Sequence, residues 1–598
     1  MKADHRTLTP DLMAWCQWMR QLLAATPISL RHPRARTWFC LMLGYNVIVA
    51  GLIWQAVAGD PYAIADDARQ HVFWMGRFTD ASLFPNDWIA DYYQSIAPVG
   101  YAWIYRFFAI VGIPPLLLCK LLPPVLIMLT GTIAFLTAFE LSRLPAAGFA
   151  AAALMTQSVG FTATLSSGTA KAFVFGLMLL FIYGWLRRSR WLSWGSIALQ
   201  GILYPQVVLL SVGLLVLGLV DRRQGKWSWR RDRALWSLTA GGLLIATVVI
   251  LYYASASSQF GPTVTLEEAL TMPEFFRGGR TNYFQTTWLK ALLNGRGGLR
   301  LDAATTPMTN FLALGLPLML RRPQRFPLAK GISRNVDILL KLAAVACFWF
   351  VAAHLLLFKL YLPSRYTSRF FFIAAVLAAA ISIVLLMDAV LGWASHQLQS
   401  PGAAQRVLSG GLAIGLASAL GLLVVLYPLT MSGYPYTSIT QGNSPDLYAF
   451  VANQSKNSLI AGTAIETNNL PTYSQRSVLV SREVAIPYHM GYYRELRQRA
   501  KQLIAAQYSP DPAVVGAFIQ QYAVTHWLLE KTDFDISKVG GDRWVQQYQP
   551  EAGAATTVLA SQQIPFLQKQ RDRCRRFEDA QHWLLDAECI LAASETAR

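Results

Sequence analysis

The feature that most constrains this chain is a succession of apolar segments, most of them long enough to cross a lipid bilayer. A helix needs about 17–25 apolar residues to span the hydrocarbon core. The candidate spans are residues 38–58, 98–112, 117–140, 145–163, 171–186, 192–219, 234–254, 307–320, 336–360, 368–392 and 407–430. Segment 192–219 is interrupted at Tyr204-Pro205 and is compatible with two short helices. The sequence therefore predicts a polytopic α-helical membrane protein with about 11–13 spans.

Basic residues gather between the apolar segments rather than on a soluble face. The chain has 52 Lys and Arg against 33 Asp and Glu, a formal net charge of +19. The main basic clusters lie within residues 31–36, 187–190, 222–233 and 321–334. Such clusters are typical of cytoplasmic loops that follow the positive-inside rule. This placement argues against nucleic-acid binding. It predicts a cytoplasmic or interfacial N-terminal segment, residues 1–37, followed by a first span that stays in the membrane.

Three segments outside the spans are too long to be simple connectors. With the basic clusters inside, residues 59–97 and 254–306 are expected to be outward loops of a transmembrane domain over residues 38–431. Loops longer than about 12–15 residues are usually functional or disordered, and the aromatic content of both loops argues against disorder. Residues 432–598 lose transmembrane character and follow the last span without a basic cluster. We therefore expect a soluble, extracytoplasmic domain there.

The pattern inside residues 432–598 alternates between two kinds of segment. Strands are predicted at 458–463, 477–481 and 526–530, and helices at 492–508 and 511–522. The second helix begins with a cap pattern at Asp511-Pro512. This alternation predicts a small α/β layer domain. Cys574 and Cys589 lie fifteen positions apart and are candidates for a disulfide if the domain faces an oxidising compartment.

The strongest local signal for chemistry is an acidic stretch directly after the first span, GDPYAIADDARQH. Asp60, Asp66 and Asp67 lie there beside Arg69 and His71. Carboxylates near a span end can act as a general base or bind a divalent cation such as Mg²⁺ or Mn²⁺. Adjacent carboxylates cannot both aim at one point from a helix, so at most one of Asp66 and Asp67 is expected to face a substrate. The alternative is a solvated acidic cap at a helix start.

Cationic side chains next to other spans are candidates for binding phosphate. Lys171 opens an apolar helix, and Arg365 and Arg369 lie in LPSRYTSR between two strong spans. Arginine is suited to bidentate contact with phosphate, so these residues are placed to neutralise a lipid-linked phosphate. Snorkelling towards headgroups is the alternative. The second outward loop adds Arg277, Arg280, Arg296 and Arg300.

Taken together, these features resemble the GT-C superfamily of integral membrane glycosyltransferases. The resemblance lies in an N-in first span, the acidic GDPYAIADDARQH at the start of a large outward loop, many further spans and an extracytoplasmic C-terminal domain. The LPSRY stretch, with Arg365-Tyr366, also looks like the Arg-Tyr element in a late loop of several such families. Walker-type loops, HExxH, paired CxxC and GxSxG motifs do not occur, so an ATP-driven pump or a zinc protease lacks its sequence signature.

The resemblance implies transfer of a sugar from a polyprenyl-phosphate donor to an extracytoplasmic lipid or glycan, in a bacterial inner membrane. It assigns the role of base or metal ligand to Asp66 or Asp67, with Asp60 third. The lipid phosphate is expected near Arg365, Lys171 or an arginine of the second loop. The other candidate site residues are Tyr366 and His71. The chain has neither the Asp-Glu pair of protein mannosyltransferases nor a WWD-type motif of oligosaccharyltransferases, which favours a smaller transfer to a lipid or glycan.

Two other classes of function remain open at the level of sequence. A transporter or flippase of a lipid-linked or anionic substrate predicts ionisable residues deep within spans. The candidates are Lys120, Glu140, Lys341, His354 and Lys359. A non-catalytic envelope assembly protein would use the loops and the C-terminal domain to bind partner subunits. Turnover of a lipid-linked sugar separates the enzyme from both alternatives.

Overall fold

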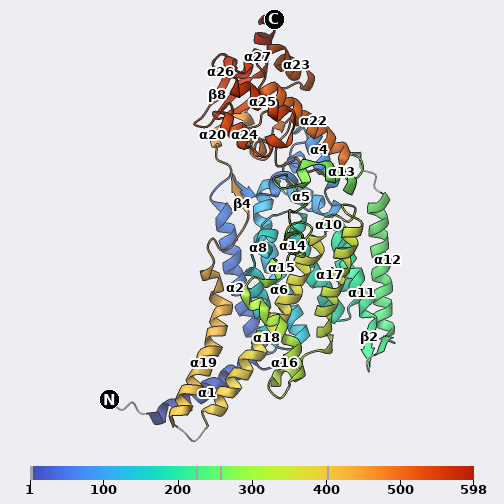
Figure 1. Cartoon of the computed structure of the whole chain (residues 1–598). Helices are drawn as coiled ribbons and strands as arrows, with labels where there is room; N and C mark the ends of the chain where they lie inside the picture. Colours follow the sequence, from blue (N-terminus) through green and yellow to red (C-terminus); the bar gives the residue numbers. More distant parts are fainter. Residues whose placement is uncertain (1–4, 224–225, 256–258, 400–402, 598) are drawn as a thin grey trace.

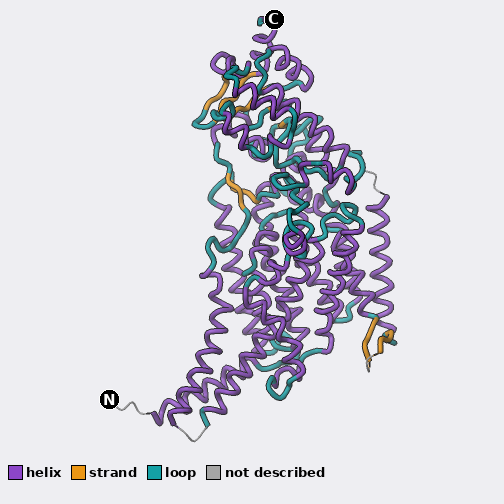
Figure 2. Tube along the Cα trace, viewed as in Figure 1, coloured by secondary structure: helices purple, strands orange, loops and turns teal. Residues whose placement is uncertain are grey.

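The computed structural model shows a helical bundle that carries a compact domain at one end (Figure 1). It describes residues 5–223, 226–255, 259–399 and 403–597. The C-terminal domain lies at the top of the view in Figure 1, at what is hereafter the domain end of the bundle, and α1 (His5–Leu23) lies at the opposite end. Helices dominate the bundle, whereas strands are concentrated in the C-terminal domain (Figure 2). The prediction of a polytopic helical membrane protein with a C-terminal α/β domain is confirmed by this architecture.

Six helices in the described residues are long and apolar enough to cross a membrane. They are α2 (Pro33–Ala58), α6 (Pro115–Ser142), α12 (Arg233–Ser255), α17 (Ile338–Leu355), α18 (Ser364–Gln397) and α19 (Ala403–Leu426). A seventh span is formed if α7 (Pro145–Thr156) and α8 (Val159–Leu165), which are bent by 77° at their junction, are counted together. The predicted number of 11–13 spans is therefore higher than the six or seven described helices that are long enough to cross the bilayer as single helices or as one bent pair.

The other predicted spans fold as shorter pieces. Segment 98–112 becomes α5 (Val99–Ile110), whose twelve residues extend for about 18 Å and fall short of an about 30 Å hydrocarbon core. Segment 307–320 becomes a 3₁₀ helix, η4 (Met308–Gly315), followed by α16 (Leu316–Arg321). The predicted break in 192–219 is confirmed, since α10 (Arg190–Leu203) and α11 (Gln206–Gly218) meet at Tyr204-Pro205. The remaining short apolar helix, α9 (Val174–Leu186), follows the 3₁₀ turn η2 (Ala170–Phe173).

Helix α18 forms the centre of the bundle, because 78% of its most apolar stretch is buried. It packs against α7, α17 and α19. All residues of α7 are buried, and six of its twelve positions are alanine. Small side chains allow close backbone approach between membrane helices. Gly131 of α6 shows the same principle, since a Cβ there would lie 1.9 Å from Nδ2 of Asn46 on α2.

The two outward segments contain short elements that meet the C-terminal domain. The first includes β1 (Ala63–Ala65), α3 (Ala68–His71), η1 (Phe73–Phe78) and α4 (Trp88–Ile96). The second includes α13 (Leu266–Thr271), η3 (Pro273–Phe275), α14 (Trp288–Leu293) and α15 (Leu301–Thr305). Strand β1 pairs antiparallel with β4 (Ile439–Gln441), which precedes the C-terminal domain, so that Ile64 lies opposite Thr440. This pairing fixes the first loop to the start of the domain.

A five-stranded mixed sheet with the order β6-β5-β7-β9-β8 organises the C-terminal domain. The predicted strands appear as β5 (Leu459–Ala461), β6 (Ser477–Val478) and β7 (His526–Glu530), which run parallel to one another. The hairpin of β8 (Arg575–Glu578) and β9 (His582–Asp586) adds two strands, and β9 pairs antiparallel with β7. The sequence did not predict this hairpin, although HWLLD at β9 closely repeats HWLLE at β7.

Helices surround this sheet. The predicted helices appear as α22 (Met490–Gln507) and α23 (Pro512–Tyr522), and the Asp511 carboxylate caps α23 by accepting from the Ala513 N–H at 2.8 Å. The further helices are α20 (Pro445–Ala452), η8 (Ile465–Asn468), α21 (Leu470–Tyr473), α24 (Ile536–Gly541), η9 (Val545–Gln547), α25 (Glu551–Ala560), α26 (Phe566–Cys574) and α27 (Ala587–Thr596). The candidate disulfide is present and links the ends of α26 and α27 through Cys574 and Cys589.

The basic connectors lie away from the domain. The hairpin of β2 (Val220–Arg223) and β3 (Lys226–Trp229) and helix α16 lie at the opposite end of the bundle from the C-terminal domain (Figure 1). The remaining short turns of the bundle are η5 (Pro327–Gly331), η6 (Arg334–Asp337) and η7 (Tyr427–Thr430). The long loops therefore gather at one end of the bundle and the basic connectors at the other.

Candidate active site

A cavity of about 490 Å³ lies between the bundle and the C-terminal domain. Its walls come from both outward loops, from the beginning of α18, from α8 and from residues 486–489 of the domain. An apolar wall is supplied by Phe161, Phe175 and Phe372. The polar wall contains Asp66, Asp67, Gln70, His71, Arg280, Arg296, Arg300, Arg365 and Arg369. Segments that are distant in sequence thus converge on one chamber that is lined by both apolar and charged side chains.

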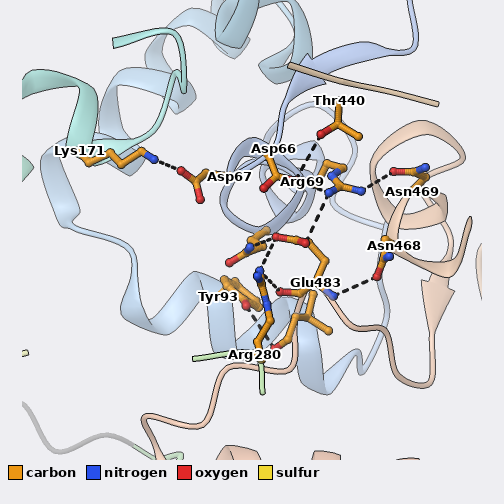
Figure 3. Close-up of polar contacts among 12 residues, drawn as sticks. Asp66, Asp67, Arg69, Tyr93, Lys171, Arg280, Thr440, Asn468, Asn469 and Glu483 are labelled. Atoms are coloured by element: carbon orange, nitrogen blue, oxygen red, sulfur yellow. Dashed lines mark hydrogen bonds and ion pairs between the residues drawn. The ribbon is translucent and has the colours of Figure 1, made fainter. Parts of the chain in front are cut away.

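The two neighbouring carboxylates line this chamber but point to different partners (Figure 3). Asp67 forms an ion pair with Lys171. Asp66 pairs with Arg69 and accepts a hydrogen bond from the Thr440 hydroxyl at 3.3 Å. Although Asp67 occupies the N-cap position of α3, its side chain makes no capping hydrogen bond. The alternative of a simple helix cap therefore does not describe this carboxylate.

Glu483 of the C-terminal domain connects the loops around the cavity (Figure 3). Its buried carboxylate pairs with Arg69 at 3.5 Å and with Arg280 at 2.6 Å, and it also accepts from the Gln70 amide. Its backbone N–H donates to Oδ1 of Asn468 at 3.0 Å. A buried charge is stable only when it is paired and hydrogen-bonded. Glu483 therefore holds the first loop, the second loop and the domain together.

The beginning of α18 presents two arginines on one face, because positions four apart in a helix lie above one another. The Nη1 of Arg365 donates to the Tyr204 hydroxyl at 2.7 Å, and its guanidinium lies 4.6 Å from the ring centre of Tyr361. The guanidinium of Arg369 lies 5.5 Å from the ring centre of Tyr204. Aromatic rings hold these cations in place without neutralising them.

The charge of the cavity wall is not balanced. The wall contains five arginines and two aspartates. Arg280 and Arg300 are paired with Glu483 and Asp302, and both aspartates are paired with cations. Within the described part of the chain, no ion pair to a carboxylate is formed by Arg296, Arg365 or Arg369. The cavity therefore offers three arginines to an anion, next to the N-terminus of a long helix that also favours negative charge.

The two histidines in the wall do not add to this positive charge. Burial lowers the pKa of His71 to about 4, and the charge of Arg365 acts in the same direction. Burial also lowers the pKa of His489, whose Nδ1 lies 3.0 Å from the Tyr92 hydroxyl. Both imidazoles are therefore neutral near pH 7 and add no positive charge to that of the arginines.

Three of the candidate residues, Asp60, Tyr366 and Lys171, are not part of the cavity wall. Asp60 accepts from the Tyr62 N–H at 2.7 Å and from the Gln441 amide at 2.6 Å, which uses its carboxylate to fix the start of the first loop. Tyr366 is buried and donates to the Leu360 carbonyl at 3.0 Å, so its hydroxyl supports the turn before α18. Lys171 reaches the cavity through its pair with Asp67.

A divalent cation at Asp66 and Asp67 would compete with the present partners of these carboxylates. Within residues 5–597, apart from the gaps given above, no group of three or more His, Cys, Asp or Glu side chains is placed to hold a metal. Asp66 and Asp67 are each paired with a cationic side chain, which competes with a metal for the carboxylate. Mg²⁺ is commonly held by one or two carboxylates together with water and substrate phosphate, so the Mg²⁺ or Mn²⁺ site at these two residues stays a prediction.

Glu483 is the main residue that sequence reasoning missed. It lies in SREVAIPY, a segment without a recognisable motif, more than 400 positions after its partner Arg69. Arg69 and Gln70 carried a weak signal, since they lie in the same stretch as the two aspartates. Only the fold reveals that all three side chains meet.

Comparisons with known proteins gave matches in shape but not in sequence. No protein-family model matches the chain, and no curated protein matches it significantly. The oligosaccharyltransferase of Archaeoglobus fulgidus, tethered to an acceptor peptide, matches with a TM-score of 0.49 and 10% identity over 86% of this chain and 72% of that chain. AglB from the same organism, in complex with an inhibitory peptide and a dolichol-phosphate, matches with a TM-score of 0.49 and 9% identity over the same shares. ArnT from Cupriavidus metallidurans, bound to undecaprenyl phosphate, matches with a TM-score of 0.41 and 13% identity over 91% of this chain and 97% of that chain.

Proposed function

We propose that this chain is a membrane glycosyltransferase that moves a sugar from a polyprenyl-phosphate donor to an acceptor hydroxyl on the extracytoplasmic side. One observation carries the proposal. One cavity at the end of a membrane-spanning bundle brings together two carboxylates and three arginines that have no carboxylate partner among the described residues. A lipid-linked donor needs its chain in the bilayer and its phosphate at the interface, and a transfer needs an acid–base group opposite that phosphate.

The arginines are assigned to the donor phosphate. Arg365 and Arg369 lie at the start of α18, and Arg296 is brought beside them because its carbonyl accepts the Ser364 N–H at 3.2 Å. As the bond between the anomeric carbon and the phosphate oxygen breaks, the electron pair and negative charge pass to the phosphate. Preorganised guanidinium groups stabilise this developing charge without reorganisation.

A first-loop carboxylate is assigned as the base. Asp67 is the first choice and Asp66 the second, since both line the cavity and have side chains that are 37% and 44% exposed. The carboxylate takes the proton from the acceptor hydroxyl while the acceptor oxygen forms its bond to the anomeric carbon. Lys171 pairs with Asp67 and so fixes the direction of its carboxylate.

This assignment places the C-terminal domain and both long loops on the extracytoplasmic side. It is supported by the separation between these segments and the basic connectors at the opposite end, in agreement with the positive-inside rule. The disulfide between Cys574 and Cys589 also fits an oxidising compartment. In a bacterium, this orientation corresponds to the inner membrane with the domain in the periplasm.

The transporter alternative receives less support from the spans. Lys120 donates to the carbonyls of Val57 and Asp60, at the domain end of α6. Lys341 pairs with Asp337, one turn from the start of α17. These cations lie near helix ends, whereas a substrate pathway predicts ionisable residues near the middle of the membrane.

The test is sugar transfer by the purified full-length protein in lipid nanodiscs, with a panel of polyprenyl-phosphate sugars. We expect turnover by the wild type, loss of turnover with retained donor binding in Asp67→Asn or Asp66→Asn, and weakened donor binding in Arg365→Ala. Asp60→Asn serves as the matched control, because its carboxylate lies outside the cavity wall. Donor binding without turnover across a full panel of acceptors would instead favour transport or a role in assembly.

A further inference from the structure

A second hollow lies where the second outward loop meets the C-terminal domain. It has a volume of about 640 Å³ and is lined by Gly278 and Arg280 of the loop and by domain residues between 465 and 547. A neighbouring hollow of about 460 Å³ shares Gly278, Arg543 and Gln547 with it. Because of these shared walls, the two hollows are adjacent, and we call them together the outer groove.

Most charges in the outer groove are balanced, but two arginines are not. Arg280, Arg482 and Lys538 each pair with a carboxylate of the domain. In the described residues, no ion pair involves Arg277 or Arg543, and both are exposed. One comes from the loop and the other from the domain. The groove therefore presents two unpaired cations, one from each of its two parts, and guanidinium groups suit a ligand with anionic groups.

The wall around these arginines contains groups that suit a saccharide. Phe276 is 38% exposed beside Arg277 and offers an aromatic surface to the apolar face of a sugar ring. The amides of Gln546 and Gln547 line the same part of the groove and supply donors and acceptors for hydroxyl groups. A few convergent polar groups beside an aromatic surface are typical of small-molecule sites.

The turn that carries Arg277 has a fixed shape. Gly278 has a φ of +93°, a conformation that favours glycine. At Gly279 a Cβ would lie 2.3 Å from the Glu274 carbonyl oxygen, so glycine is needed there too. The turn therefore holds Arg277 on the side of the groove and Arg280 on the side of the inner cavity.

Arg280 connects the two spaces, because it lines both the inner cavity and the outer groove. Its pair with Glu483 forms the partition between them. We propose that the outer groove binds the acceptor of the transfer reaction and that this acceptor is an acidic saccharide carrying carboxylate or phosphate groups. This inference rests on the proposed function. Opening of the Arg280–Glu483 pair would connect a saccharide held by Arg277 and Arg543 to the inner cavity that Asp67 lines.

The experiment measures binding of hexagalacturonate, of a phosphorylated maltohexaose and of neutral maltohexaose to the purified full-length protein in nanodiscs. We expect at least one acidic hexasaccharide to bind about tenfold more tightly than the neutral one, with the preference falling at high salt because exposed charges are screened. The two acidic probes distinguish carboxylate from phosphate recognition. Arg277→Gln and Arg543→Gln should each weaken acidic binding about three- to fivefold, the range expected for exposed charge pairs.

Arg573→Gln is the matched control, since Arg573 is an exposed arginine of the same domain that does not line the groove. Donor binding in the same samples reports on folding and on the inner cavity. Equal affinity for acidic and neutral probes, or unchanged acidic binding in the double variant, would overturn the inference. Loss of sugar transfer with this acidic preference intact would count against the proposed function and not against the groove.

Discussion

Glu483 offers the sharpest test of how the C-terminal domain completes the cavity. Glu483→Gln keeps the size of the side chain but removes the charge that pairs with Arg69 and Arg280. Removing one partner of a buried ion pair typically costs about 3–5 kcal/mol. Arg280 is 28% exposed and Arg69 retains Asp66, so we expect a smaller loss, about 2–3 kcal/mol, in the free energy that holds the loops to the domain.

Hydrogen–deuterium exchange of the protein in nanodiscs measures this loss directly. When local opening limits exchange, a cost of this size corresponds to about 30- to 140-fold faster exchange. The increase should appear in residues 66–71, 277–283 and 479–486, which contain the contacts of Glu483. Helix α18 should keep its protection, because its central packing does not depend on this residue.

The matched control is Glu578→Gln. Glu578 pairs with Lys531 and Arg575 on the exposed hairpin of the domain, and we expect exchange at the level of the wild type. Unchanged exchange in residues 66–71 and 277–283 of Glu483→Gln would refute the conclusion that this carboxylate joins the loops. Faster exchange throughout the bundle would show general unfolding rather than loss of a local connection.

Three further predictions concern other parts of the chain. Burial, with a contribution from Glu530, raises the pKa of Asp533 to about 7. Between about pH 4 and 7 the folded domain therefore keeps a proton on Asp533 that the unfolded chain has released, so the stability of the domain should fall as the pH rises through this range. Asp533→Asn should flatten this pH dependence. The measurement is thermal unfolding of the domain, followed by proteolysis within residues 440–597. Cys589→Ser removes the disulfide to Cys574, which closes a short loop, and should lower the unfolding free energy of the domain by about 2–3 kcal/mol. The same proteolysis under oxidising conditions measures this loss. Under reducing conditions the wild type and the variant should have equal stability. Arg365→Lys keeps the positive charge but loses the planar guanidinium that can contact two phosphate oxygens at once. We expect about tenfold weaker binding of a polyprenyl phosphate. An unchanged affinity would count against the assignment of Arg365 to the phosphate.

Several features of the fold follow from local sequence. The length of the apolar runs predicts α2, α6, α12, α17, α18 and α19, because a helix that crosses lipid must be long and apolar whatever surrounds it. The break at Tyr204-Pro205 follows from the chemistry of proline. The capped start of α23 follows from Asp511. In each case, the cause lies within a few positions of its effect.

The span count shows where such reasoning stops. A segment such as 98–112 is apolar enough for a span but folds as the short helix α5, which packs against α10 and η1 while Trp103 and Ile110 stay exposed. Periodicity and hydropathy report that a residue avoids water, and they do not report whether lipid or protein covers it. The bent pair α7–α8 and the 3₁₀ segment η4 are likewise set by packing against α18.

The sequence by itself determined that this chain is built into a membrane, which of its loops are long, and that Asp66, Asp67, Arg365 and Arg369 are unusual residues near span ends. Only the tertiary structure decided that these four line one cavity, that Asp60 and Tyr366 do not, and that Glu483 closes the arrangement. The physical reason is distance along the chain. An apolar run or a helix cap is a property of neighbouring residues, whereas a charged site is formed by side chains hundreds of positions apart whose spacing depends on how all the helices between them pack.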